Sequence, residues 1–176
     1  MKAVEVDGFS FRFEDAIDAF VFDGKDVTKA TFHGAPMKAV DIITEFANCY
    51  VYIEMKDYDD PSIYDIRSAM SDDEQIKRKR RFNWLKDYLK YKFRDSYLYR
   101  HAEQKVDKPI HYICLNNFDS GLNFLIQKSL RLELPVGKPS DRWIQSLVVS
   151  CHVVNFERWE KLFPKWEISC LTSISN

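Results

Sequence analysis

The sequence predicts an α/β protein with a mixed central sheet flanked by helices. Two runs rich in β-branched and aromatic residues follow one another at residues 38–46 and 49–58, which is typical of a hairpin. Further on, apolar runs at 110–115 and 144–154 alternate with segments of helical periodicity. A hairpin followed by β-α-β alternation implies antiparallel and parallel pairing within one sheet.

The composition bounds the class of protein. The 176 residues suit a single domain, residues 1–176, and 45% hydrophobic content can fill a real core. No run of about 18 apolar residues is present, so we expect no membrane-spanning helix. The start lacks the apolar stretch of a signal peptide, and the four cysteines form no CxxC pair, so we expect free thiols and a cytoplasmic location.

Before the hairpin, the signals are short and mixed. Residues 9–13 alternate as a short strand does, and residues 14–24 have acids first and glycine last, as a short helix has. The Phe-Val-Phe run at 20–22 favours a strand instead. Residues 29–36 suggest a brief β-like segment closed by glycine and proline.

After the hairpin, helix signals are stronger. Asp60 and Pro61 predict the start of a short helical turn that runs to Met70. Ser71 and Glu74 form a capping box, from which a helix of roughly 25 residues runs without Gly or Pro to position 100. The remaining elements are expected as strand 110–115, helix 119–134, strand 144–154, helix 155–163 and strand 166–172.

The hairpin sets charged residues on one face. With a tight turn at residues 47–48, Asp41 lies across from Glu54, and Lys56 follows on the same face because side chains alternate. This face is expected to hold Ala39, Asp41, Ile43, Glu45, Tyr50, Tyr52, Glu54 and Lys56. The opposite, nearly all apolar face is expected to hold Val40, Ile42, Thr44, Phe46, Cys49, Val51, Ile53 and Met55.

Two facing carboxylates destabilise a sheet unless something neutralises them. A divalent cation does so, since Mg²⁺ binds oxygen ligands and commonly uses one or two carboxylates with substrate phosphate. Lys56 would then hold or deprotonate the attacking water, or meet the charge that builds up on the phosphate. The alternative is that Glu54 and Lys56 are ordinary solvent-facing residues, with Asp41 in a loose salt bridge. A change of one residue in the loop would also break this pairing.

These residues resemble the motif of the PD-(D/E)XK nuclease superfamily. Asp41 is followed, after twelve residues, by Glu-Met-Lys at 54–56, in the strand pair VDIITEF and YVYIEMKD. The resemblance covers roughly residues 12–116, and Val40 stands where the family name has proline. It implies a restriction-endonuclease-like αβββαβ core, here with a C-terminal βαβ-type extension. Some members of such folds lack activity, so the fold alone does not establish catalysis.

The resemblance also implies roles for individual residues. Asp41 and Glu54 would bind Mg²⁺ or Mn²⁺, the carbonyl of Met55 would join them, and Lys56 would be the catalytic lysine. An additional acidic ligand would come from the first helix, as Glu14 or Asp18.

Charge is unevenly distributed along the chain. Residues 1–75 contain 7 Lys and Arg against 17 Asp and Glu, whereas residues 76–176 contain 19 against 10. The long helix in the basic half has an apolar stripe of Phe82, Leu85, Leu89, Phe93 and Tyr97, and a basic stripe of Lys79, Lys86, Lys90 and Arg94. The basic stripe suggests a face that follows a nucleic-acid backbone, although charge runs are more often solvated surface.

The sequence therefore predicts a metal-dependent nuclease that hydrolyses phosphodiester bonds of DNA or RNA. One rival is an inactive relative that serves as a protein-binding module of the immunity or regulatory type. Another is a plain nucleic-acid-binding domain. The expected partners are nucleic acid and, through a homodimer or a separate chain, protein; no membrane partner is expected.

Overall fold

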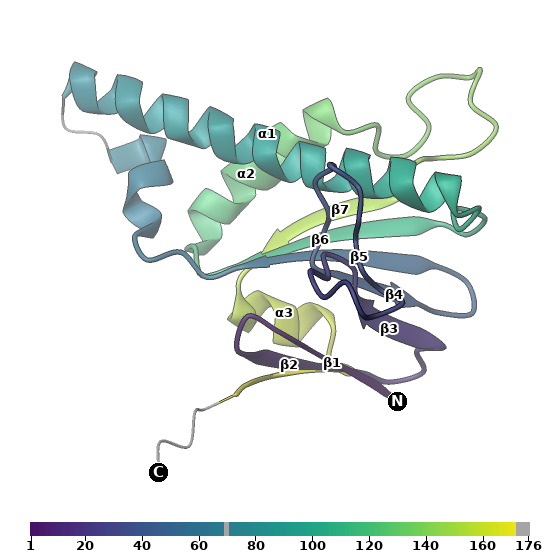
Figure 1. Ribbon diagram of the computed structural model, residues 1–176. Coiled ribbons are helices and arrows are strands. Elements are labelled where there is room, and N and C mark those ends of the chain that lie inside the picture. Colours follow the sequence, from purple (N-terminus) through teal and green to yellow (C-terminus); the bar gives the residue numbers. More distant parts are fainter. Residues whose placement is uncertain (69–70, 172–176) are drawn as a thin grey trace, which may run out of the picture.

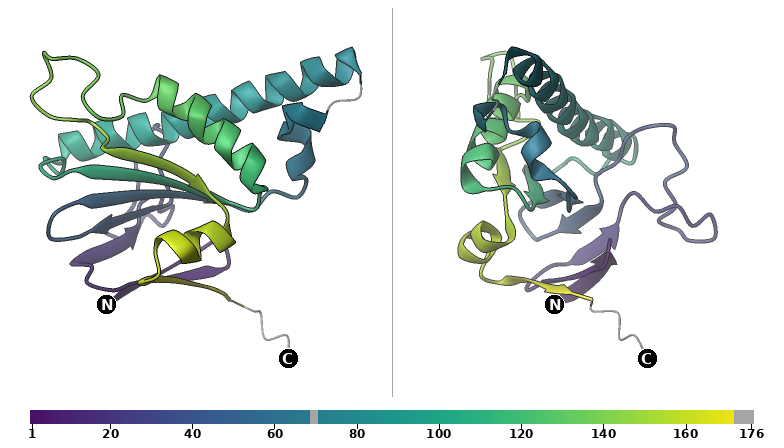
Figure 2. Two further views of the ribbon diagram at one scale, coloured as in Figure 1. Left: turned by 180° about the vertical axis from the view of Figure 1, so that it is seen from behind. Right: turned by 90° about the vertical axis from the view of Figure 1, so that its left-hand side faces the viewer.

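The computed structural model describes residues 1–68 and 71–171 and has three layers (Figure 1). Helices α1 and α2 cover one face of a five-stranded sheet, while a three-stranded sheet and α3 cover the other (Figures 1 and 2). The central sheet consists of β3 (Asp18–Val21), β4 (Ile42–Glu45), β5 (Tyr50–Lys56), β6 (Ile110–Asn116) and β7 (Ser150–Val154). The second sheet consists of β1 (Lys2–Val6), β2 (Phe9–Phe13) and β8 (Trp166–Cys170). The helices are α1 (Asp72–Ala102), α2 (Ser120–Glu133) and α3 (Phe156–Leu162), with 3-10 turns η1 (Pro61–Tyr64) and η2 (Ile66–Ser68).

The central sheet is mixed, as predicted. Strands β3, β4 and β5 pair antiparallel, and β5, β6 and β7 pair parallel through the crossovers of α1 and α2. The β4–β5 hairpin has the predicted register, with Ile42 opposite Ile53 and Glu45 opposite Tyr50. Both faces of β5 are buried, so the face that carries Glu54 lies beneath the helices and does not face solvent.

The predicted helix at 14–24 is wrong. The segment forms the edge strand β3, since Phe20 packs toward α1 while Val21 packs toward the second sheet, an alternation that only a strand provides. A turn with Asp15 at φ 62° separates β3 from β2. The β-like segment predicted at 29–36 is a loop, with one isolated bridge between Gly24 and Phe32.

The C-terminal part differs from the predicted βαβ extension. Strand β7 begins only at Ser150, and β8 pairs with β2 in the second sheet and not with the central one. The pairing follows from aromatic packing, because Trp166 lies opposite Phe13 and Trp159 of α3 packs edge-on against Phe11. The residues of the predicted elements at positions 69–70 and 172 lie outside the described part of the chain.

Helix α1 begins and packs as its sequence indicates. The Ser71 hydroxyl accepts a hydrogen bond from the Glu74 backbone N–H at 3.2 Å, which caps the first turn. The apolar stripe packs against the sheet, with Tyr97 half-buried and its other four members buried, and the Tyr112 hydroxyl donates to the Leu89 carbonyl at 2.9 Å. In the described part of the chain, no helix combines the length and apolar character needed to cross a bilayer.

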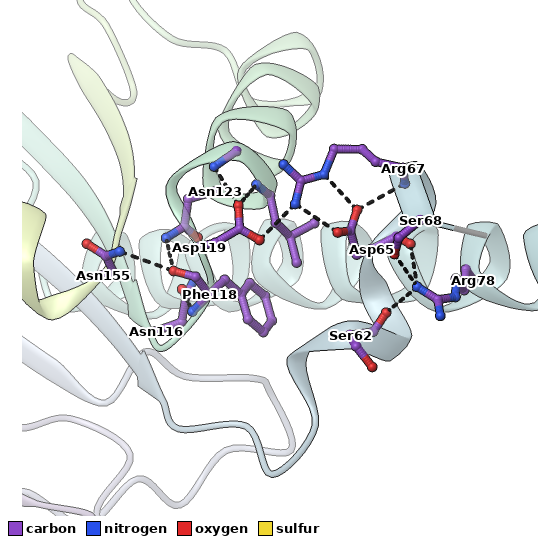
Figure 3. Close-up of polar contacts among 12 residues, drawn as sticks. Ser62, Asp65, Arg67, Ser68, Arg78, Asn116, Phe118, Asp119, Asn123 and Asn155 are labelled. Carbon is purple, nitrogen blue, oxygen red and sulfur yellow. Dashed lines mark hydrogen bonds and ion pairs between the residues drawn. The ribbon is translucent and has the colours of Figure 1, made fainter. Parts of the chain in front are cut away.

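The connection from β5 to α1 is fixed by two arginines (Figure 3). Arg78 of α1 donates to the carbonyl groups of Ser62 and Asp65 at 2.8 and 2.9 Å. Arg67 donates to the carboxylates of Asp65 and Asp119, and Asp119 in turn caps α2. The segment that follows the end of β5 is therefore tied to both helices.

Truncation of the α1 core stripe should destabilise the protein. We expect Leu85→Ala to lower the free energy of unfolding by about 2–5 kcal/mol, because a buried leucine leaves a cavity. Urea denaturation followed by circular dichroism measures this loss. The exposed Lys79→Ala is the control and should stay within about 0.5 kcal/mol of the wild type. Equal stability of both variants would contradict the packing of α1.

Candidate functional site

A cavity of about 600 Å³ lies where the end of β5 meets α1 and the loop after β3. Its walls are strongly charged, with carboxylates and lysines from separate parts of the chain. The carboxylates are Asp7, Asp23, Asp26, Asp41 and Glu54. The lysines are Lys25, Lys29, Lys56 and Lys92. The predicted trio of Asp41, Glu54 and Lys56 therefore lines one cavity.

Asp41 continues the hairpin register just before β4. Its backbone N–H donates to the Ile53 carbonyl at 3.0 Å, and its carbonyl accepts from the Phe22 N–H at 2.8 Å, so it lies between β3 and β5. One carboxylate oxygen, Oδ2, accepts the Met55 N–H at 2.7 Å. The other oxygen, Oδ1, lies 3.7 Å from the Lys92 ammonium.

The carboxylates converge on Lys92 of α1, which the sequence analysis did not predict as a site residue. The Lys92 Nζ lies 3.1 Å from Glu54 Oε2, 3.7 Å from Asp41 Oδ1 and 3.8 Å from Asp23 Oδ2. Lys92 is only 6% exposed and Glu54 only 2%. An ammonium group therefore occupies the position between the acids that the sequence analysis assigned to a metal ion.

A hydrogen-bond chain holds Asp41 and Lys92 in place relative to one another. The Val40 N–H, next to Asp41, donates to the Ser96 hydroxyl at 2.9 Å. Ser96 donates to the carbonyl of Lys92, one helical turn earlier, at 2.7 Å. The strand segment that presents the carboxylate is thus tied directly to the helix turn that presents the ammonium.

Burial sets the proton affinities of this cluster. Burial, followed by the charge of Asp41, raises the pKa of Glu54 to about 8. Burial also raises the pKa of Asp41. Burial opposes the charged form of Lys92, but the carboxylates of Glu54 and Asp41 outweigh it and raise its pKa. The Tyr88 hydroxyl donates to Glu54 Oε1 at 3.0 Å and so stabilises the ionised carboxylate.

The oxygen atoms of Asp41 and Glu54 are of the chemical type that binds divalent cations. Carboxylate oxygens are the ligands that Mg²⁺ and Mn²⁺ prefer. Glu54 Oε2 is buried and accepts no well-oriented hydrogen bond from the described residues, so its one close contact is the Lys92 ammonium. Within the described residues, no three His, Cys, Asp or Glu side chains are grouped closely enough to hold a metal ion. The carboxylates are spaced around an ammonium group, which a metal ion would have to displace.

Lys56 and Met55 complete this end of β5. The Lys56 side chain is exposed at the cavity and forms no ion pair with any residue the structure describes. Met55 also lines the cavity, although its side chain is buried in the core beneath the sheet. The role of its carbonyl as a metal ligand stays a prediction.

The additional acids expected from a first helix lie elsewhere. Glu14 is exposed, and Asp18 stands opposite Glu45 at the far end of the β3–β4 ladder, so neither lines the cavity. The further acids that do reach it are Asp23 and Asp26, in the loop after β3, and Asp7, at the β1–β2 turn. The expectation failed because the segment that would have formed the helix is a strand.

The predicted basic stripe of α1 is not one free cationic face. Lys86 and Lys90 both pair with Glu133 of α2, and Lys90 does so at 2.6 Å. Lys79 and Arg94 are exposed at the two ends of this stripe. Two of its four charges therefore hold α1 against α2.

The sequence gives only a weak indication that Lys92 is a site residue. It lies between Leu89 and Phe93, at the edge of the stripe that faces the core, where a charged residue needs a buried partner. The partner itself is 38 positions earlier in the chain, so no local pattern identifies it.

Comparison with known proteins adds no relative. The chain matches no protein-family model, no curated protein and no solved structure.

The raised pKa of Glu54 should make stability depend on pH. The pKa of Glu54 is about 8 in the folded state, against an ordinary value of 4.5. Between pH 4.5 and 8, Glu54 is therefore protonated to a greater extent in the folded than in the unfolded protein. The stability that this proton contributes is fully present below the ordinary pKa and is lost as the pH rises through the folded pKa. We expect Glu54→Gln to remove this fall in the free energy of unfolding.

Urea denaturation at about pH 5, 6.5 and 8 tests this expectation. The exposed Glu160→Gln is a control for the change in charge and should keep the wild-type slope. Identical slopes in the wild type and Glu54→Gln would show that Glu54 is not held as the geometry indicates.

Proposed function

We propose that the protein is a metal-dependent phosphodiester hydrolase that acts on DNA or RNA. One observation supports this most directly: buried carboxylates from neighbouring strands, Asp41 and Glu54, face one cation position in a cavity that also exposes Lys56. A cluster that binds a cation beside an accessible lysine suits the chemistry of a phosphodiester, which is anionic and gains charge in its transition state.

The order of elements supports the proposal as a resemblance. Three antiparallel strands, β3, β4 and β5, are followed by α1 and by β6 parallel to β5. This order is similar to the strand and helix order of the restriction-endonuclease-like core, apart from its first helix. In place of an acid from that helix, the chain offers Asp23 from the loop after β3.

Each residue then has a defined task. Asp41 and Glu54 would hold Mg²⁺ or Mn²⁺, which when bound would supply Lewis acidity to the phosphate and lower the pKa of a bound water. Lys56 would position the attacking water or neutralise the charge that develops on the phosphate. Without a metal ion, the Lys92 ammonium lies 3.1 Å from Glu54 and 3.7 Å from Asp41 and so offsets their negative charge.

Removal of the Lys56 ammonium should abolish most of the activity. We expect cleavage of a labelled oligonucleotide in Mg²⁺, and a loss of about 100-fold or more in Lys56→Ala, because proton transfer and charge stabilisation would both be lost. Lys161→Ala, on the far surface of α3, is the control and should cleave normally. Equal rates in the Lys56→Ala and control proteins would refute the assignment.

A second candidate is a protein-binding module that has kept the scaffold without catalysis. Its supporting observation is that the Lys92 ammonium already compensates the acids, at 3.1 Å from Glu54 and 3.7 Å from Asp41. In that case the cluster is structural, and the cavity needs no metal ion.

Thermal unfolding with and without Mn²⁺ separates the two candidates. If the protein is a hydrolase, Mn²⁺ at 100 times its Kd should stabilise the wild type by about 2.7 kcal/mol and so raise its Tm. The same concentration should leave the Tm of Asp41→Asn unchanged. For a binding module, Mn²⁺ changes nothing, and Asp41→Asn is more stable than the wild type because one of the crowded acids is gone. Lys92→Met tests whether Mn²⁺ displaces the Lys92 ammonium. If the ion takes the position of the ammonium, Mn²⁺ should bind more tightly to this variant than to the wild type.

A further inference from the structure

A row of side chains on α1 leads outward from the cavity. Lys92, Tyr88, Trp84, Arg81 and Lys77 are separated by four, four, three and four positions, so they share one face of the helix. We call this row the cavity stripe. At 1.5 Å per residue it extends about 22 Å from the acids toward the start of α1. That half of the helix projects past the ends of the central strands (Figure 1).

Contacts connect the inner end of the cavity stripe to the acids. The Tyr88 hydroxyl donates to Glu54 Oε1 at 3.0 Å, and the Trp84 ring stacks on Tyr88 with centroids 5.4 Å apart and planes at 18°. The Lys38 ammonium lies 4.8 Å from the centre of the Tyr88 ring. An unbroken set of contacts therefore links the buried carboxylate to the surface.

Trp84 is the exposed end of this stacked pair. Trp84 is 58% exposed, and the residues beyond it on the same face, Arg81 and Lys77, are exposed cations. Stacking bases on aromatic rings while cations contact the backbone is how proteins hold single-stranded nucleic acid. In a duplex the base faces are already stacked on one another, so an exposed indole gains little from it.

We infer that the cavity stripe binds a single strand of nucleic acid, with a base stacked on Trp84 and phosphates on Arg81 and Lys77. The inference builds on the proposed function, because it names the form of substrate whose phosphate would reach Lys56. The length of the stripe suits a site of about four nucleotides. The acidic first turn of α1, from Asp72 to Glu74, limits the stripe at its outer end.

The opposite face of α1 offers a matched control. Lys79 is exposed and only two residues from Lys77, yet it lies on the side of the helix that Lys86 and Lys90 share. Those two lysines are paired with Glu133 of α2. A change at Lys79 removes the same charge without touching the cavity stripe.

The test measures binding without cleavage. Fluorescence anisotropy of a labelled oligonucleotide of about 12 nucleotides, single-stranded or annealed to its complement, is recorded with the full chain in EDTA. We expect the single strand to bind more tightly, and Trp84→Ala to weaken it about tenfold or more, whereas Trp84→Phe retains a ring and most of the affinity. Lys77→Ala and Arg81→Ala should each lower the salt slope by about 0.7, and Lys79→Ala should leave it unchanged.

The outcomes separate this inference from the proposed function. Unchanged affinity in Trp84→Ala, or equal binding of duplex and single strand, overturns the inference, even if Mg²⁺-dependent cleavage is found. Loss of binding in Trp84→Ala together with retention in Trp84→Phe supports it, even if no cleavage is found. Urea denaturation of each variant confirms that the protein is folded, as an exposed position predicts.

Discussion

The ion-pair cluster between Lys92 and the carboxylates of Glu54 and Asp41 is the constraint on which the site depends. Each buried charge costs several kcal/mol to remove from water, and two facing carboxylates also repel one another. The ammonium offsets both penalties only if α1 lies at the correct height over β4 and β5. The bond from Val40 to Ser96 fixes that height, so the charges and the layers of the fold are stabilised together.

The two candidate functions differ in which cation compensates the negative charge of the acids, the Lys92 ammonium or a metal ion. The ammonium stands 3.1 Å from Glu54 and 3.7 Å from Asp41, whereas Mg²⁺ would bind their oxygens at about 2.0–2.1 Å. If a metal ion replaced the ammonium, the carboxylates would have to move inward and the Lys92 side chain would have to leave its position. Tyr88 contacts Glu54 from the helix side and would respond to that movement, together with the indole of Trp84 stacked on it.

Local patterns predicted the elements whose stability is local. The register that sets Asp41 across from Glu54 follows from a tight turn and a period of two, and the start of α1 follows from its capping box at Ser71. The predictions for short segments were wrong because distant contacts decide the structure of these segments. Residues 18–21 are a strand because both of their faces meet distant packing partners, and β8 joins β2 because of contacts across nearly the whole chain.

The sequence by itself determined the hairpin, the long amphipathic helix and the placement of two acids and a lysine at one end of β5, because each rests on spacing within a few residues. Only the tertiary structure decided which cation meets those acids. Lys92 is 38 positions from Glu54, and α1 must cross the sheet before the two can touch. Tertiary packing also decided that Asp23 and not Asp18 reaches the cavity. Asp18 begins β3 opposite Glu45, at the far end of the ladder, whereas Asp23 follows the end of β3, where the Phe22 N–H bonds to the Asp41 carbonyl.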